Sequence, residues 1–160
     1  MELEQTQVDD FLAAKKVALG EGPVDWEHKT PELATWSAIV EVDAVRKGEV
    51  RLVANPRVDR AWSFMLLLHK TAVYRLEDQP PPARHLNRGC PESFPRRIGC
   101  EPHEHVWIRG RDLHCARPVD SLRDGDHHDF FKAFCERANL EFQSEYRPPE
   151  PPMQMLELGS

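Results

Sequence analysis

The sequence has no long apolar run. Its longest, Phe64-Met65-Leu66-Leu67-Leu68, is far shorter than the roughly 20 residues of a membrane-spanning helix. An excess of basic residues is also missing, since 21 Lys and Arg face 27 Asp and Glu and give a net charge of −6. That charge argues against a general nucleic-acid coat or a basic membrane binder.

Several chemical signatures are missing as well. The sequence contains no Gly-rich phosphate loop, no Rossmann fingerprint and no Gly-x-Ser-x-Gly, which argues against nucleotide-binding domains and serine hydrolases of those types. It has no Cys-x-x-Cys. The acidic N-terminus lacks the apolar stretch of a secretory signal, so we expect a cytoplasmic protein with no membrane partner and four reduced cysteines.

The length of 160 residues suits one domain. We expect that domain to cover 1–146, followed by a mobile Pro-rich tail at 147–160. Apolar spacing predicts a helix that begins near Thr6 and stops at Gly20, and a second that Asp126 caps and Asn139 ends. Residues 20–34 read as a loop.

Alternating apolar residues between the helices predict strands over 36–42, 49–54, 61–77 and 103–115, with a bend near 69–71 in the third stretch. The fold class we expect is α+β: a curved antiparallel sheet of four to six strands, with the N-terminal and C-terminal helices packed on it.

A long polar loop begins at Asp78, and loops of this length in a compact domain are often functional. Residues 84–123 contain eight arginines and five acids, whereas the rest of the chain is strongly acidic. A local basic face of this kind is a candidate anion or phosphate site. The alternative is an ordinary solvent-exposed surface of mixed charge. The binding residues that we select from this region are Asn87, Arg96, Arg97, Trp107, Arg109 and Arg111.

The sharpest local pattern is His103-Glu104-His105. Residues two apart on a strand point to the same side, so both imidazoles share one face. Three interpretations stay open: half of a metal site, acid–base chemistry near neutral pH, or histidines that are held by hydrogen bonds for structural reasons.

If a metal is bound, the sequence offers Cys90, Cys100, His103 and His105 as ligands and zinc as the ion. The spacing matches no standard zinc finger or ribbon, so we expect no cofactor but keep zinc open as the alternative. Cys135 lies on the apolar stripe of the last helix and is expected to be a core thiol.

Three short motifs resemble a family of small bacterial and phage proteins that is described only as a domain of unknown function. They are Arg75-Leu76-Glu77, the Pro-rich loop through His85-Leu86-Asn87, and Pro102-His103-Glu104-His105-Val106-Trp107. The paired-histidine strand is similar, more loosely, to TumE-type toxins of toxin–antitoxin modules. Cys100-Glu101 departs from the family pattern, and segment 88–101 has no counterpart in it.

The resemblance implies a small conflict-system or regulatory protein. Because no single catalytic set is forced by the sequence, and a net charge of −6 suits mimicry of nucleic acid, we expect it to act by binding a protein or nucleoprotein partner, such as a cognate antitoxin or a defence complex, including CRISPR inhibition. The alternative is a metal-independent endoribonuclease that cleaves RNA with His85, His103 and His105 as acid–base groups and Arg75 as the phosphate clamp.

Overall fold

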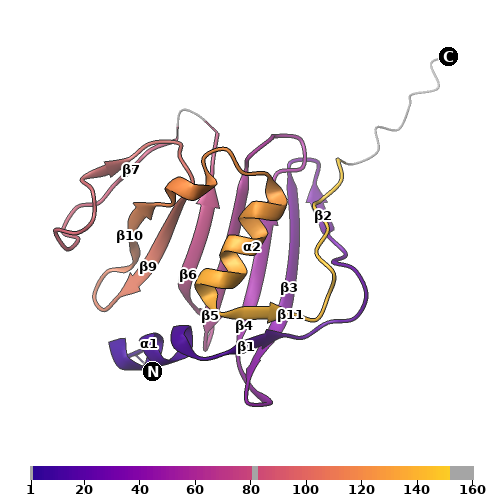
Figure 1. The fold of residues 1–160 in the computed structure, drawn as a ribbon, viewed down its shortest axis with the longest axis horizontal. Coiled ribbons are helices and arrows are strands. Elements are labelled where there is room, and N and C mark those ends of the chain that lie inside the picture. Colours follow the sequence, from indigo (N-terminus) through magenta and orange to yellow (C-terminus); the bar gives the residue numbers. More distant parts are fainter. Residues whose placement is uncertain (1, 81–82, 152–160) are drawn as a thin grey trace.

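A computed structural model describes residues 2–80 and 83–151 as an α+β fold with two α-helices and a large mixed sheet (Figure 1). The α+β class is therefore confirmed. The elements are α1 (Gln5–Ala13), β1 (Lys16–Ala18), β2 (Glu27–Thr30), β3 (Leu33–Val42), β4 (Val45–Ala54), β5 (Trp62–Leu68), β6 (Thr71–Asp78), β7 (His85–Leu86), β8 (Arg97–Ile98), β9 (His103–Ile108), β10 (Asp112–Pro118), a short 3-10 helix (Asp120–Leu122), α2 (His127–Ala138) and β11 (Leu140–Phe142).

The sheet has nine strands in the order β10-β9-β6-β5-β4-β3-β1-β11, with β2 paired to β3. The expected four to six strands were too few, because short strands such as β1, β2 and β11 carry too little alternation to stand out in the sequence. Every pair is antiparallel except β1 and β11, which run parallel.

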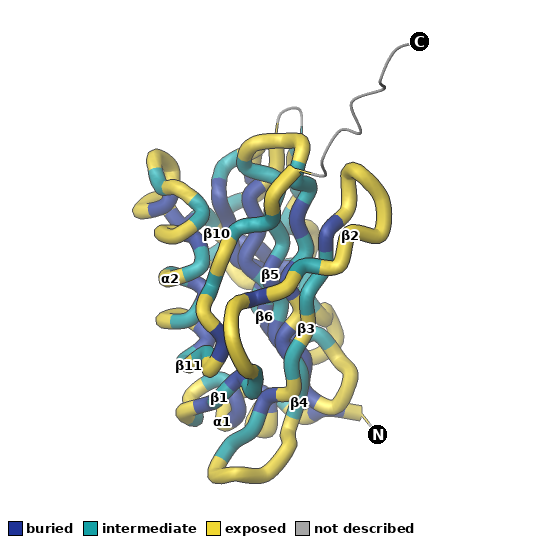
Figure 2. The backbone as a smooth tube through the Cα atoms, turned by 90° about the vertical axis from the view of Figure 1, so that its right-hand side faces the viewer, coloured by how far each residue is buried: buried dark blue, intermediate teal, exposed yellow. Residues whose placement is uncertain are grey.

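The helix α2 crosses one face of the sheet and carries much of the core (Figure 1). Its Phe130 and Phe134 are almost fully buried, and both rings pack against Phe64 of β5. In Figure 2, buried stretches lie along the strands of the sheet and along α2. The predicted ends of this helix are confirmed: Asp126 accepts from the Asp129 amide, and Asn139 ends the helix in the left-handed conformation.

The first helix is shorter than the spacing predicted. It begins after the N-cap residue Glu4 rather than Thr6 and ends at Ala13, and Lys16 already lies in β1. Lys16 is 1% exposed, and its ammonium donates to the carbonyls of Phe11, Leu12 and Ala14. The lysine therefore caps the last turn of α1 from the strand, where carbonyl groups have no partner within the helix.

The long loop after β6 contains a small two-stranded sheet of β7 and β8. Cys90 in this segment forms a disulfide with Cys115 of β10, so the expectation of four reduced cysteines was wrong. The sequence could not show this pairing because the two residues are 25 positions apart on different elements. Cys100 and Cys135 are free thiols, and Cys135 is partly buried against the core as expected.

Neither α-helix within the described ranges is long and apolar enough to cross a membrane. The expected mobile tail lies mostly outside the described residues, which end at 151. Within them, Trp26 donates its indole N–H to the carbonyl of Arg147.

Candidate metal centre

The pairing of β6 with β9 builds the candidate site. Glu77 lies opposite His103 and Arg75 lies opposite His105 in the antiparallel register. Because alternate residues of a strand share a face, these four side chains point to the same side of the sheet. Glu104 lies between the two histidines and points to the other face, where it bonds to Arg137 of α2.

Three side-chain atoms meet at one point of this face. His105 Nε2 lies 3.1 Å from His103 Nε2 and 3.1 Å from Glu77 Oε2, and His103 Nε2 lies 3.3 Å from the same carboxylate oxygen. All three residues are at least nine-tenths buried. Ligands bound about 2.0–2.2 Å from a zinc ion at tetrahedral angles are themselves about 3.3–3.6 Å apart, so this triangle is close to the size of one face of a metal site.

The other ring nitrogen of each histidine is already committed to the backbone. His103 Nδ1 lies 2.8 Å from the carbonyl of Glu101, and His105 Nδ1 lies 2.8 Å from the carbonyl of Leu113. A carbonyl only accepts, so Nδ1 carries a proton in both rings, and a ring with no second proton presents a lone pair at Nε2. Metal-bound histidines are usually oriented by such a backbone bond.

When neither ring carries a second proton, the triangle brings together three electron-pair donors with no hydrogen between them. Without a cation, the groups can avoid repulsion only by sharing added protons among the two rings and the carboxylate of Glu77. A divalent ion would satisfy all three donors at once. Glu77, His103 and His105 could thus hold a metal ion.

Charges around Glu77 stabilise its anionic form. Burial by itself would raise the pKa of Glu77, but hydrogen bonds from His103 and His105 and the charge of Arg75 together hold that pKa well below its usual range. Arg75 Nε lies 3.1 Å from Glu77 Oε1 without the angle of a hydrogen bond, and Ser63 donates to the same oxygen at 3.3 Å. Burial opposes a charge on His103, yet the bonds to Glu77 and to the Glu101 carbonyl raise its pKa above the usual value.

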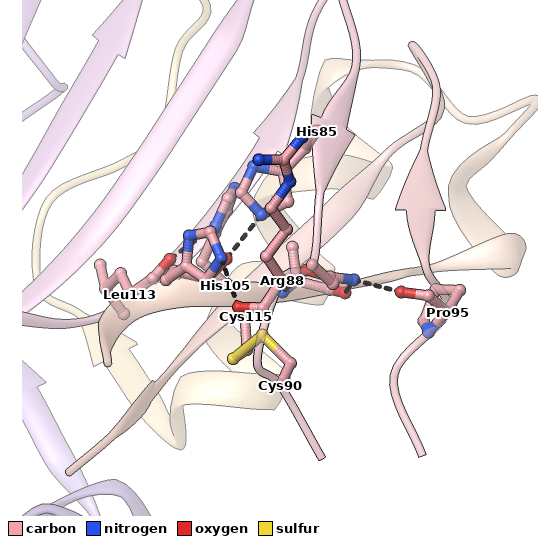
Figure 3. Close-up of a disulfide and its surroundings, with 10 residues drawn as sticks. His85, Arg88, Cys90, Pro95, His105, Leu113 and Cys115 are labelled. Atoms are coloured by element: carbon pink, nitrogen blue, oxygen red, sulfur yellow. Dashed lines mark hydrogen bonds between the residues drawn. A yellow bond between two sulfur atoms is a disulfide. The ribbon is translucent and has the colours of Figure 1, made fainter. Parts of the chain in front are cut away.

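His85 brings a third imidazole to the edge of the site. Its ring lies edge-on to the ring of His105 with centroids 5.1 Å apart, and its Nε2 donates to the carbonyl of His114 (Figure 3). Burial lowers the pKa of His85, which favours the neutral ring. The structure thus places the ring of His85 against His105 and Arg75 against Glu77, while the convergence of these residues on one anion and their catalytic roles stay a prediction.

The other residues selected from the sequence take different positions. Asn87 is used structurally, because its amide bonds to the carbonyls of Pro95 and Ala116 and to the Ala116 amide. Trp107 is 6% exposed and belongs to the core rather than to a surface. Arg109 pairs with Glu4, away from the triangle.

The cysteines suggested as metal ligands do not join the histidines. Cys90 is bonded to Cys115, which removes its thiolate as a ligand, and Cys100 is exposed. Figure 3 shows the disulfide near His85 and His105 but separate from their rings. The two histidines of the proposed set are kept, and a carboxylate takes the place of the cysteines.

That carboxylate, Glu77, is the residue of the candidate site that the sequence did not point to. It stands at the end of an apolar strand, two residues after Arg75, within a motif that was singled out for the arginine. Only the register of β6 against β9 shows that it lies opposite His103. A charged residue next to a run of apolar strand residues was the available signal.

Comparison of the chain with models of known protein families, with curated proteins and with solved structures finds no match.

Proposed function

We propose that this protein binds one divalent transition-metal ion, zinc in the first instance, through Glu77, His103 and His105. The observation that supports this is the buried triangle of Nε2, Nε2 and Oε2 atoms with edges of 3.1 to 3.3 Å. Two imidazoles and one carboxylate are a ligand set that suits zinc and other first-row metals.

A set of three protein ligands leaves at least one position of the ion for water or substrate. A zinc ion with such an open position lowers the pKa of the water bound there to about 7, so hydroxide is available at neutral pH. The reaction class that this favours is hydrolysis. Arg75, 28% exposed and in contact with the carboxylate of Glu77, is the nearest permanent cation that could bind an anionic substrate group.

The experiment is a calorimetric titration of metal-free protein with Zn²⁺, repeated with Co²⁺ so that visible absorption reports the coordination. We expect one Zn²⁺ or Co²⁺ ion per chain. The visible absorption spectrum of the Co²⁺ form should indicate a low coordination number. Glu77→Gln and His105→Ala should each weaken binding at least 100-fold, since each removes a ligand.

The matched control is His28→Ala, because His28 is exposed on β2, away from the triangle, and its loss should leave the affinity unchanged. Circular dichroism establishes that each variant is folded. The proposal is wrong if folded wild-type protein takes up no metal, or if Glu77→Gln binds as tightly as the wild type.

A second candidate is the metal-independent ribonuclease that we proposed from the sequence. It is supported by the position of His85, whose ring contacts that of His105 and which is less buried than the other two histidines. In this case RNA cleavage would persist in the presence of a chelator and would be lost in His85→Ala. Action through a protein or nucleoprotein partner also stays a proposal.

A further inference from the structure

Four arginines gather in the segment 84–97, which we call the arginine hairpin. It carries Arg84, Arg88, Arg96 and Arg97 and only one acid, Glu92. Its net charge is opposite in sign to that of the whole chain, which is −6. Such a local reversal of charge concentrates anions on one part of an otherwise repulsive surface.

These four arginines have no ion-pair partner among the residues that the structure describes. The same holds for Arg111, whose guanidinium lies over Gly89 of the hairpin. Most other arginines of the described chain are paired with an acid. Within the described residues, the chain thus leaves these five arginines without an ion-pair partner, although it has an excess of carboxylates.

The strand pairing directs several of these charges outward. In and on either side of β7, Arg84, Leu86 and Arg88 are exposed, and they alternate with the partly buried His85 and Asn87. Arg97 of β8 lies opposite Leu86 in the register, so it shares that outer face. The outer face of the hairpin is therefore cationic around a single exposed apolar residue.

The hairpin is also fastened to the sheet at three points. The disulfide joins Cys90 to Cys115, the Asn87 amide bonds to both backbone groups of Ala116, and His85 bonds to the carbonyl of His114 (Figure 3). At its turn, Gly89 has a φ of +72°, and a Cβ there would overlap the guanidinium of Arg111. A segment that is fixed to the sheet in this way loses less conformational entropy on binding a ligand than a flexible loop does.

We propose that the arginine hairpin binds single-stranded nucleic acid through its phosphates. Protein interfaces usually centre on a buried apolar or aromatic cluster, and here Leu86 is the one large apolar residue that is well exposed on the described hairpin. Phe94 is partly buried beside Arg117 and offers an aromatic ring next to the cations, which is the combination that single strands use. Because the hairpin contains His85, a nucleic acid bound to it would lie toward the candidate metal centre. The proposal does not depend on metal binding.

The test is fluorescence anisotropy with a labelled 12-nucleotide RNA and a DNA of the same sequence, using metal-free protein. We expect binding of at least one of them at 50 mM KCl. If four phosphates are neutralised, binding should weaken about 50-fold between 50 and 200 mM KCl. Comparison of the RNA and DNA arms shows which source of phosphates the hairpin prefers.

The variant is the double substitution Arg96→Glu with Arg97→Glu, which should reduce affinity at least 10-fold. The control is Arg46→Glu with Lys47→Glu, an exposed basic pair at the start of β4 that gives the same change in net charge. A second pair, Arg84→Glu with Arg88→Glu, serves if the first variant does not fold.

Three results would overturn the proposal. The first is no binding of either oligonucleotide at 50 mM KCl. The second is an equal loss of affinity in the control pair, which would make the effect one of net charge alone. The third is equal affinity for a poly-glutamate peptide of the same charge. Because every arm uses metal-free protein, failure here leaves the metal proposal standing, and failure of the metal titration leaves this one standing.

Discussion

Glu104 is a buried charged residue on the face of the sheet that α2 covers. Its side chain is 3% exposed and accepts four hydrogen bonds: one from the Tyr74 hydroxyl at 2.6 Å, one from Arg117 at 2.8 Å, and two from Arg137 at 2.9 and 3.0 Å. We predict that Glu104→Gln, which keeps the shape but removes the charge, strongly destabilises the fold.

The magnitude follows from what the substitution leaves unpaired. Removal of one partner of a buried ion pair typically costs about 3–5 kcal/mol. The side chains of Arg117 and Arg137 are 51% and 40% exposed, so water recovers part of their solvation and the lower end applies. We expect a loss of about 3 kcal/mol in the free energy of unfolding, or about 6–12 °C in Tm for a chain of this size.

The assay is urea unfolding followed by circular dichroism, with Tyr74→Phe and Glu49→Gln measured beside it. Tyr74→Phe removes one hydrogen bond to a carboxylate and should cost about 1.5 kcal/mol. Glu49 pairs with Arg51 at the surface of β4, so its substitution should cost less than about 0.5 kcal/mol. If Glu104→Gln were within about 1 kcal/mol of the wild type, the network would not have the energetic role argued here.

Two further predictions concern the cross-link and the buried lysine. Reduction of the Cys90–Cys115 disulfide, which closes a loop with a sequence separation of 25, should lower the free energy of unfolding by about 3.5 kcal/mol on a chain-entropy basis; an unchanged urea midpoint in reductant would contradict this. Burial lowers the pKa of Lys16 to about 8 from 10.5, so the unfolded chain holds this proton more tightly and stability rises with pH between those values. Relative to Lys16→Met, the wild type should gain about 2 kcal/mol between pH 7.5 and 9.5 in urea unfolding, and a flat difference would refute the assignment.

The parts of the fold that were predictable are those that local chemistry determines. The helix from Asp126 to Asn139 carries its cap, its apolar stripe and its stop within a few residues of one another. The hairpin of β3 and β4 carries apolar residues two apart on both strands, from Trp36 to Val42 and from Val50 to Ala54, although β4 begins at Val45, earlier than predicted. These signals do not depend on contacts between distant parts of the chain.

Features that depend on distant pairing were not predictable. Lys16 looked like a basic residue at the end of a helix, but the parallel pairing of β1 with β11 places it under that helix. The disulfide of Cys90 likewise depends on where the hairpin lies against β10. Strands as short as three residues offer too few positions to show a period.

The candidate site was half predictable for the same reason. His103 and His105 share a face by their spacing alone. Glu77 enters the site only through the register of β6 against β9, which cannot be deduced from the sequence. Cysteines close in sequence were a natural choice of ligand, but proximity along the chain did not bring them to the histidines.

The most direct test of the metal centre is X-ray absorption spectroscopy at the zinc edge on protein loaded with one equivalent of Zn²⁺. The account predicts a first shell of two imidazole nitrogens and at least one oxygen, at about 2.0–2.2 Å, with no sulfur. In Glu77→Gln the zinc signal should be lost or its oxygen shell altered. A shell containing sulfur at about 2.3 Å, or one without imidazole scattering, would contradict the assignment of Glu77, His103 and His105 as the ligands.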